Sequence, residues 1–67
     1  MRRFRGNMNG EQYLGNTESK EVHDLDNEDT NANGCQIDEI IDAEHDKPFA
    51  TLSSALDEGF NKCAKCF

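Results

Sequence analysis

Apolar residues recur at helical spacing in the second half of the chain. Ile37, Ile40 and Ile41 follow the i, i+3, i+4 pattern, and acidic residues fill the positions between and after them. One face of such a helix is apolar and the opposite face is charged. The pattern therefore predicts a short amphipathic helix over about residues 36–44, which Pro48 prevents from continuing.

A second apolar stripe predicts another short helix over residues 52–58. The stripe consists of Leu52, Ala55 and Leu56. Thr51 precedes it, and a threonine hydroxyl at this position can accept a hydrogen bond from a backbone N–H of the first turn. Gly59 follows it, and glycine readily adopts the left-handed conformation that ends many helices. Both ends of this helix are thus marked in the sequence.

Short stretches of alternating apolar and polar residues predict strands. Residues 21–25 alternate around Val22, which is typical of a short strand. Gly15-Asn16 is a turn dipeptide of the kind that connects two strands, and residues 49–50 can form a brief extended segment. The fold class that follows is a small α+β domain, with short strands or a hairpin and two or three short helices.

Two segments lack any apolar periodicity. Residues 1–12 contain glycine, asparagine and arginine without a period of two or about 3.6 residues, so we expect a flexible basic tail. Residues 27–34 contain almost nothing apolar, which predicts a surface loop. The expected organisation is one folded domain over residues 13–67 that follows the tail.

The composition indicates that apolar burial alone does not stabilise this domain. The chain has 67 residues, of which 34% are hydrophobic and none is Trp. A chain of this size buries too little apolar surface for an enzyme-type core, and below roughly 70 to 80 residues disulfides, a structural metal or a partner usually help. Its three cysteines are an odd number, so they cannot form a complete disulfide framework.

The charge balance argues against a nucleic-acid function. Fourteen acidic residues against seven Lys and Arg give a net charge of -7. Because affinity for phosphate backbones comes mainly from Lys and Arg, we expect no specific binding to nucleic acid, although three arginines lie in the first five residues. The acidic loop and the helix face of Asp38, Glu39 and Asp42 instead favour a basic protein partner.

No part of the sequence indicates a membrane or secretory segment. No apolar run approaches the ~20 residues that a spanning helix needs, and the first residues do not lead into the apolar stretch of a secretory signal. We therefore expect a cytoplasmic monomer. In a reducing compartment, a close cysteine pair indicates a metal site rather than a disulfide.

The residues Cys63-Ala-Lys-Cys66 form the strongest chemical motif of the chain. Two thiolates at this spacing can both turn toward one ion when the backbone bends in a tight turn. A closed structural site needs four ligands, and Cys35 can supply the third. His23, at the end of the predicted strand, is a better fourth ligand than His45, whose acidic surroundings indicate a solvated surface residue. Thiolate and imidazole ligands favour Zn²⁺, although a rubredoxin-like iron site also fits.

The cysteines and the acidic run also allow other interpretations. The cysteines could be small apolar core residues, or Cys63 and Cys66 a redox pair, although a thioredoxin-type site needs a βαβ scaffold that this length cannot hold. The acidic run from Asp24 resembles a calcium loop in its first positions. Its sixth residue is Asp29 where a glycine is needed, and its twelfth is Cys35 where a glutamate is needed, which excludes that site.

Residues 13–67 also carry a family-like pattern. Its most specific part is an alanine, three residues, a glycine, an aromatic residue, two residues and the cysteine pair, which here runs from Ala55 to Cys66. Earlier matches are Gly15-Asn16, Ser19-Lys20, His23, Cys35 and Phe49. This pattern resembles the small zinc-binding module at the front of bacterial Ada-type DNA alkylation-repair proteins.

The resemblance implies a compact α/β zinc module with His23, Cys35, Cys63 and Cys66 as ligands. The family separates its first two ligands by only a few residues, whereas eleven residues, 24–34, lie between His23 and Cys35. This chain therefore carries an insertion at that point.

The repair proteins accept a methyl group on a cysteine at the first ligand position, which here is His23. A metal-bound imidazole nitrogen has no spare nucleophilic electron pair, so methyl transfer is not implied. We expect a non-catalytic zinc-binding module with a protein-interaction, structural or regulatory role. The alternatives are an Ada-like module that contacts DNA, and a small peptide precursor or metal-handling protein.

Overall fold

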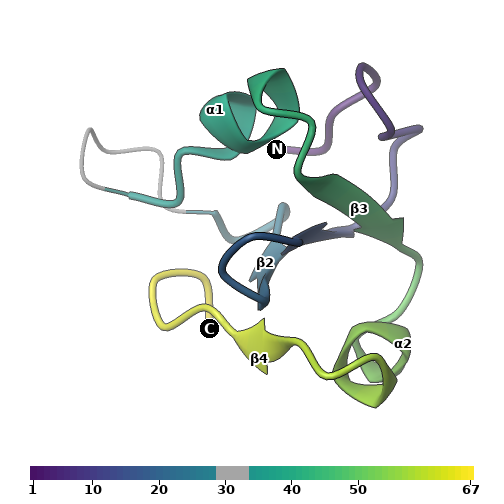
Figure 1. The fold of residues 1–67 in the computed structure, drawn as a ribbon, viewed down its shortest axis with the longest axis vertical. Coiled ribbons are helices and arrows are strands. Elements are labelled where there is room, and N and C mark those ends of the chain that lie inside the picture. The colour runs from purple at the N-terminus through teal and green to yellow at the C-terminus, as the bar shows by residue number, and fades with distance from the viewer. Residues whose placement is uncertain (29–33) are drawn as a thin grey trace.

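The computed structural model describes residues 1–28 and 34–67. In chain order its elements are β1 (Tyr13–Asn16), β2 (Glu21–Asp24), α1 (Ile37–Asp42), β3 (Asp46–Phe49), α2 (Leu52–Asp57) and β4 (Asn61–Lys62). The strands form one mixed sheet in the order β3-β1-β2-β4, with α1 and α2 at opposite sides of it (Figure 1). The predicted small α+β class is confirmed.

Strand β1 lies inside the sheet and pairs antiparallel with both β2 and β3. The predicted turn at Gly15-Asn16 is wrong in its position, because both residues belong to β1 and the chain turns at residues 17–20. Asn16 nevertheless shapes that turn. Its Oδ1 atom accepts hydrogen bonds from the backbone N–H groups of Glu18 (2.9 Å) and Ser19 (3.4 Å).

Successive side chains of β1 and β2 point to opposite faces of the sheet, and this alternation separates two apolar clusters. Leu14 and the facing His23 point toward α1, whereas the next pair, Gly15 and Val22, points toward α2. The α1-side cluster consists of Met8, Leu14, Leu25, Cys35, Ile37, Ile40, Ile41, Cys63 and Cys66. The α2-side cluster consists of Val22, Phe49, Ala55 and Phe60, with Tyr13 and Leu52 packed against it.

Both predicted helices are present, each slightly shorter than expected. The isoleucines of α1 are buried, as its periodicity predicts. At the start of α2, Thr51 Oγ1 accepts a hydrogen bond from the Ser54 N–H (3.3 Å). Gly59 follows the helix with a φ of 91°, the left-handed conformation expected of it.

Strands β3 and β4 were also not fully predicted from the sequence. The extended segment expected at residues 49–50 is strand β3, which begins at Asp46 and includes Pro48. Proline is tolerated there because β3 is an edge strand, so its missing N–H leaves no partner unsatisfied within the sheet. Strand β4 has two residues, both exposed, and carries no apolar pattern that could have revealed it.

Residues 1–12 fold back over the domain in the structure. Met8 is 1% exposed and belongs to the α1-side cluster. The backbone N–H of Asn7 donates to the Asp46 carboxylate (2.8 Å), which anchors the segment beside β3. This packing could not be predicted from apolar periodicity, because it depends on one buried residue, Met8. The division into a tail and a domain at residue 12 stays a prediction.

The loop expected at residues 27–34 lies mostly outside the described residues. Its first residues are described, and Asp24 caps the turn that leads into it: the Asp24 carboxylate accepts hydrogen bonds from the Asp26 N–H (3.0 Å) and Asn27 Nδ2 (2.9 Å). Among the helices of the described ranges, none has the length and apolar character needed to cross a bilayer.

Candidate metal centre

Four buried residues from three parts of the chain meet on the α1 side of the sheet. They are His23, Cys35, Cys63 and Cys66, and one potential ligand atom of each lies within 4.8 Å of those of the others. Each residue is at most 7% exposed. The structure therefore brings together the four residues selected from the sequence, and none of the three cysteines is in a disulfide.

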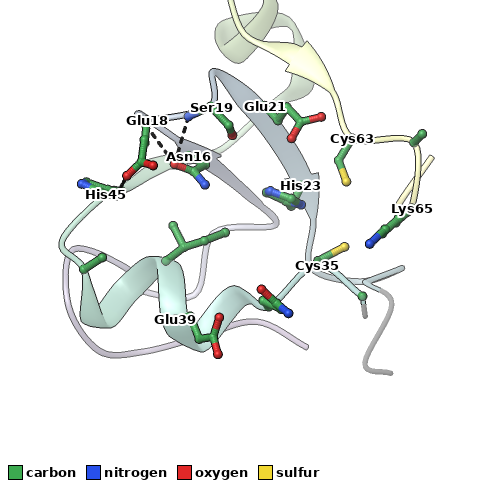
Figure 2. A pocket seen from close by; sticks show the side chains of 15 residues that line it. Asn16, Glu18, Ser19, Glu21, His23, Cys35, Glu39, His45, Cys63 and Lys65 are labelled. Atoms are coloured by element: carbon green, nitrogen blue, oxygen red, sulfur yellow. Dashed lines mark hydrogen bonds and ion pairs between the residues drawn. The ribbon is translucent and has the colours of Figure 1, made fainter. Parts of the chain in front are cut away.

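The sheet register places His23 beside the cysteine pair. Strands β2 and β4 are parallel, with Val22 opposite Lys62, and the Cys63 N–H donates to the Val22 carbonyl (3.0 Å). His23 is the next residue of β2, so its side chain lies next to that of Cys63 on the α1-facing side (Figure 2). The short strand β4, which was not predicted from the sequence, thus brings Cys63 next to His23.

A tight turn brings the second cysteine of the pair back to the same point. The Cys63 carbonyl accepts hydrogen bonds from the N–H groups of Cys66 and Phe67, both at 3.2 Å. Such a turn is what two thiolates at this spacing need to share an ion. It leaves Cys66 Sγ 3.6 Å from His23 Nδ1.

Cys35 enters the site from the start of α1. Gln36, between Cys35 and the helix, has a φ of 53° and a ψ of 47°, a left-handed conformation that few residues other than glycine adopt. The Gln36 carbonyl accepts a hydrogen bond from the Ile40 N–H (3.3 Å), so the turn is part of the helix start. A non-glycine residue held in this conformation is a feature that functional sites often contain.

Burial changes the proton affinity of two of the four residues. It lowers the pKa of His23 below its ordinary value, which keeps the imidazole neutral and able to bind a metal at neutral pH. Burial, followed by a hydrogen bond with Cys35, raises the pKa of the Cys66 thiol to about 12. In the metal-free protein Cys66 is therefore a thiol, and an ion that binds there displaces its proton.

Three other ionisable side chains near the site, those of His45, Asp24 and Asp26, are already engaged. His45 lies outside the four-residue group, with its Nδ1 atom 3.0 Å from a Glu18 carboxylate oxygen. The Asp24 carboxylate caps its own turn and also accepts from Gln12 Nε2 (3.2 Å). Asp26 is paired with Arg2. None of these groups is arranged to replace His23.

A cavity of about 460 Å³ opens beside the four residues. His23, Cys35 and Cys63 form part of its wall, and Figure 2 shows their side chains grouped at one side of it. Glu21 and Glu39 also line it, from β2 and α1. Glu21 was not predicted as a site residue, although its position two residues before His23 on the same strand places both side chains on one face.

Comparison with known proteins gives no family for this chain. A scan against protein-family models, a search of curated proteins and a search of solved structures each found no match. The resemblance to the Ada-type module stays a prediction from the sequence pattern.

Proposed function

We propose that this chain is a small zinc-binding module in which the ion is a structural element. The observation that carries the proposal is the group of four buried ligand atoms within 4.8 Å of one another. Tetrahedral zinc with Zn–S bonds of about 2.3 Å needs ligand atoms about 3.8 Å apart, so a contraction of roughly 1 Å is sufficient. Three thiolates and one imidazole form a typical structural zinc set.

Filled coordination also favours a role without catalysis. A catalytic zinc keeps one position for water or substrate, whereas four protein ligands occupy all positions of a tetrahedral ion. Zinc suits this mixed sulfur and nitrogen set better than harder cations do. Because the thiols must stay reduced to bind, the proposed setting is the cytoplasm.

The partner that we propose is a basic protein segment that docks at the cavity. Two of the acids expected to face a partner, Asp38 and Asp42, are paired with the chain's own arginines. Glu39 lines the cavity together with Glu18 and Glu21; Lys65 also lines it, so the acids outnumber the lysine. Cationic side chains of a partner would complement this acidic wall, which borders the metal centre.

The two alternatives have less support. A module that contacts DNA through the N-terminal arm would need available cations there, yet Arg2, Arg3 and Arg5 contact carboxylates of this chain. We therefore expect no specific binding to nucleic acid. A metal-handling protein would release its ion readily, whereas ligands that are at most 7% exposed favour retention.

Metal analysis of the purified chain tests the zinc site. We expect one Zn²⁺ per chain, three thiols that resist a thiol reagent until a chelator is added, and the same result for the matched control His45→Ala. A chain that carries no zinc after purification and after zinc addition, with all thiols reduced, would refute the proposal. Iron in place of zinc would show as a coloured protein and correct the identity of the ion.

Titration with a short lysine-rich peptide tests the partner class. The double variant Glu21→Gln/Glu39→Gln should bind it more weakly than the parent chain. Asp57→Asn, an exposed acid on α2 away from the cavity lining, is the control and should bind as the parent does. Equal binding by all three proteins, or by none, would contradict a basic partner at the cavity.

A further inference from the structure

The N-terminal residues 1–8 contact the chain on both sides of Cys35. Arg3 reaches Glu28, which precedes Cys35 in the sequence, and Asp38, which follows it in α1. Figure 1 shows this N-terminal segment close to α1. The Arg3 side chain thus connects a segment before Cys35 with a segment after it.

The Arg3 contacts are the most enclosed ion pairs of the segment. Arg3 Nη2 lies 3.0 Å from Glu28 Oε2, Nη1 contacts the other carboxylate oxygen, and Nε lies 3.0 Å from Asp38 Oδ1. The side chains of Arg3 and Glu28 are 10% and 4% exposed. Burial alone would raise the pKa of Glu28, but hydrogen bonds from Arg3 and the Met1 amino group hold that pKa below its ordinary value. The planar guanidinium matches such a two-carboxylate arrangement, which a lysine cannot reproduce.

An apolar anchor fixes the same segment to the metal centre. Met8 is buried in the α1-side cluster, which includes all three cysteines. Its backbone N–H donates to the Arg5 carbonyl (3.0 Å), so the turn after the arginines is closed. Ion pairs at one end and a buried side chain at the other therefore dock the segment against the region that contains Cys35.

We propose that Arg3 is a positioning residue of the metal centre, which holds Cys35 beside the other ligands by joining Glu28 to Asp38. This inference rests on the proposed zinc site. Eleven residues separate His23 from Cys35, and bringing two ligands together across such a separation costs conformational entropy. A bridge that forms within the protein fold removes part of this cost from the binding step. By linkage, docking of the segment and binding of the metal strengthen each other equally.

Titration of the full chain with Co²⁺ tests this role, because the intensity of the thiolate-to-cobalt absorption follows the number of bound thiolates. Arg3→Ala and the nearly isosteric Glu28→Gln should each weaken Co²⁺ binding about tenfold, the effect of losing a buried charge-assisted hydrogen bond. Both should also lower the thiolate absorption per bound ion, since Cys35 is the ligand released. Arg3→Lys should restore less than half of the lost affinity, on a logarithmic scale.

Arg2→Ala is the matched control. Arg2 makes a comparable pair with Asp26, but both side chains are more than 40% exposed, so affinity should change by about twofold or less. A double variant, Arg3→Ala/Glu28→Gln, should bind about as weakly as each single variant, because both remove the same bridge.

Three outcomes separate this inference from the proposed function. If the parent chain binds no Co²⁺ or Zn²⁺, the metal site itself is wrong and the inference is wrong with it. If the parent binds and Arg3→Ala binds equally well, Arg3 does not position a ligand, although the site stands. If Arg3→Ala weakens binding while its thiolate absorption at saturation equals that of the parent, Arg3 contributes to general stability and the positioning role is refuted.

Discussion

The two sides of the sheet are stabilised in different ways. On the α2 side the rings of Phe49 and Phe60 pack edge to face, with centroids 5.3 Å apart and an angle of 68° between planes. On the α1 side three cysteines share a buried cluster with leucine, isoleucine and methionine side chains, and Arg3 pairs with Glu28 and Asp38. Aromatic packing needs no additional group, whereas buried thiols contribute little apolar area. We therefore expect the geometry of the α1 side to depend directly on the proposed ion, and the α2 side to depend on it only through the stability of the whole fold.

Removal of the metal should destabilise the fold more than any single substitution does. Without an ion, the short helices bury too little surface to offset an ordering cost of roughly 1 to 2 kcal/mol per residue, so the chain should unfold. Circular dichroism with excess chelator measures this, and zinc added back in excess should restore the signal. Unchanged helicity with a sharp thermal transition in the metal-free protein would show that the apolar clusters suffice.

Single ligand substitutions should rank next. Cys66→Ser should weaken metal binding more than His23→Ala, because the thiolate carries charge into the site and a water molecule can take the vacant imidazole position. The nearby carboxylate of Asp24 is engaged in its own hydrogen bonds and gives little compensation. Competitive zinc titration compares the two variants. A His23→Ala protein that loses zinc as completely as Cys66→Ser would reverse the order.

The α2 side can be weakened without touching the ion. Phe60 is 4% exposed, and Phe60→Ala should lower the free energy of unfolding of the metal-loaded protein by about 3 kcal/mol or more. Leu56→Ala, at a residue of α2 that is 42% exposed, is the control and should cost less than about 1 kcal/mol. Chemical denaturation gives both values.

Cobalt spectroscopy shows whether the two sides are independent. The thiolate absorption of Co²⁺-loaded Phe60→Ala should match that of the parent chain, because Phe60 belongs to the other cluster. A changed absorption would mean that the aromatic packing also positions the ligands.

Metal affinity should depend on pH through Cys66. Burial raises the pKa of this thiol above its ordinary value, so the folded metal-free site holds the proton and an ion must displace it. Raising the pH therefore strengthens binding, and the displaced Cys66 proton contributes about tenfold per pH unit between about pH 7 and 8. His23 adds nothing in this range, because its pKa is lowered from 6.5 and the imidazole is already neutral. Zinc competition at several pH values gives the slope, and Cys66→Ser should lower it by about one proton; an equal slope in both proteins would contradict the assignment.

Local patterns in the sequence predicted the helices and the four candidate ligands. The isoleucine spacing, the Thr51 cap and Gly59 act over one or two helical turns, so no knowledge of the rest of the chain was needed. The cysteine pair is likewise a local motif. Choosing His23 over His45 depended on its place at the end of a strand, and in the structure His45 pairs with Glu18 away from the cysteines.

Features that join distant residues could not be predicted in this way. Strand β4 has two exposed residues and is defined by its pairing with β2, some forty residues earlier in the sequence. The bridge from Arg3 to Glu28 and Asp38 spans the chain similarly, and its residues have no special spacing. Position 15 of β1 needs a glycine because a Cβ atom there would come within 2.7 Å of the rings of Phe49 and Phe60, and this contact cannot be read from the local turn pattern.

Removal of the α2 cap should have the smallest effect on stability. It also tests whether the two sides of the sheet are independent of each other. Thr51→Ala removes the hydroxyl that accepts the Ser54 N–H and should cost about 1 kcal/mol of stability in the metal-loaded protein. Thr51→Ser keeps the hydroxyl and should lie within a few tenths of a kcal/mol of the parent. Because α2 packs on the face of the sheet opposite the cysteines, zinc affinity should be unchanged in both variants. A loss of affinity in Thr51→Ala that Thr51→Ser restores would show that the helix start and the metal centre are coupled, and that the two sides of the sheet form one cooperative unit.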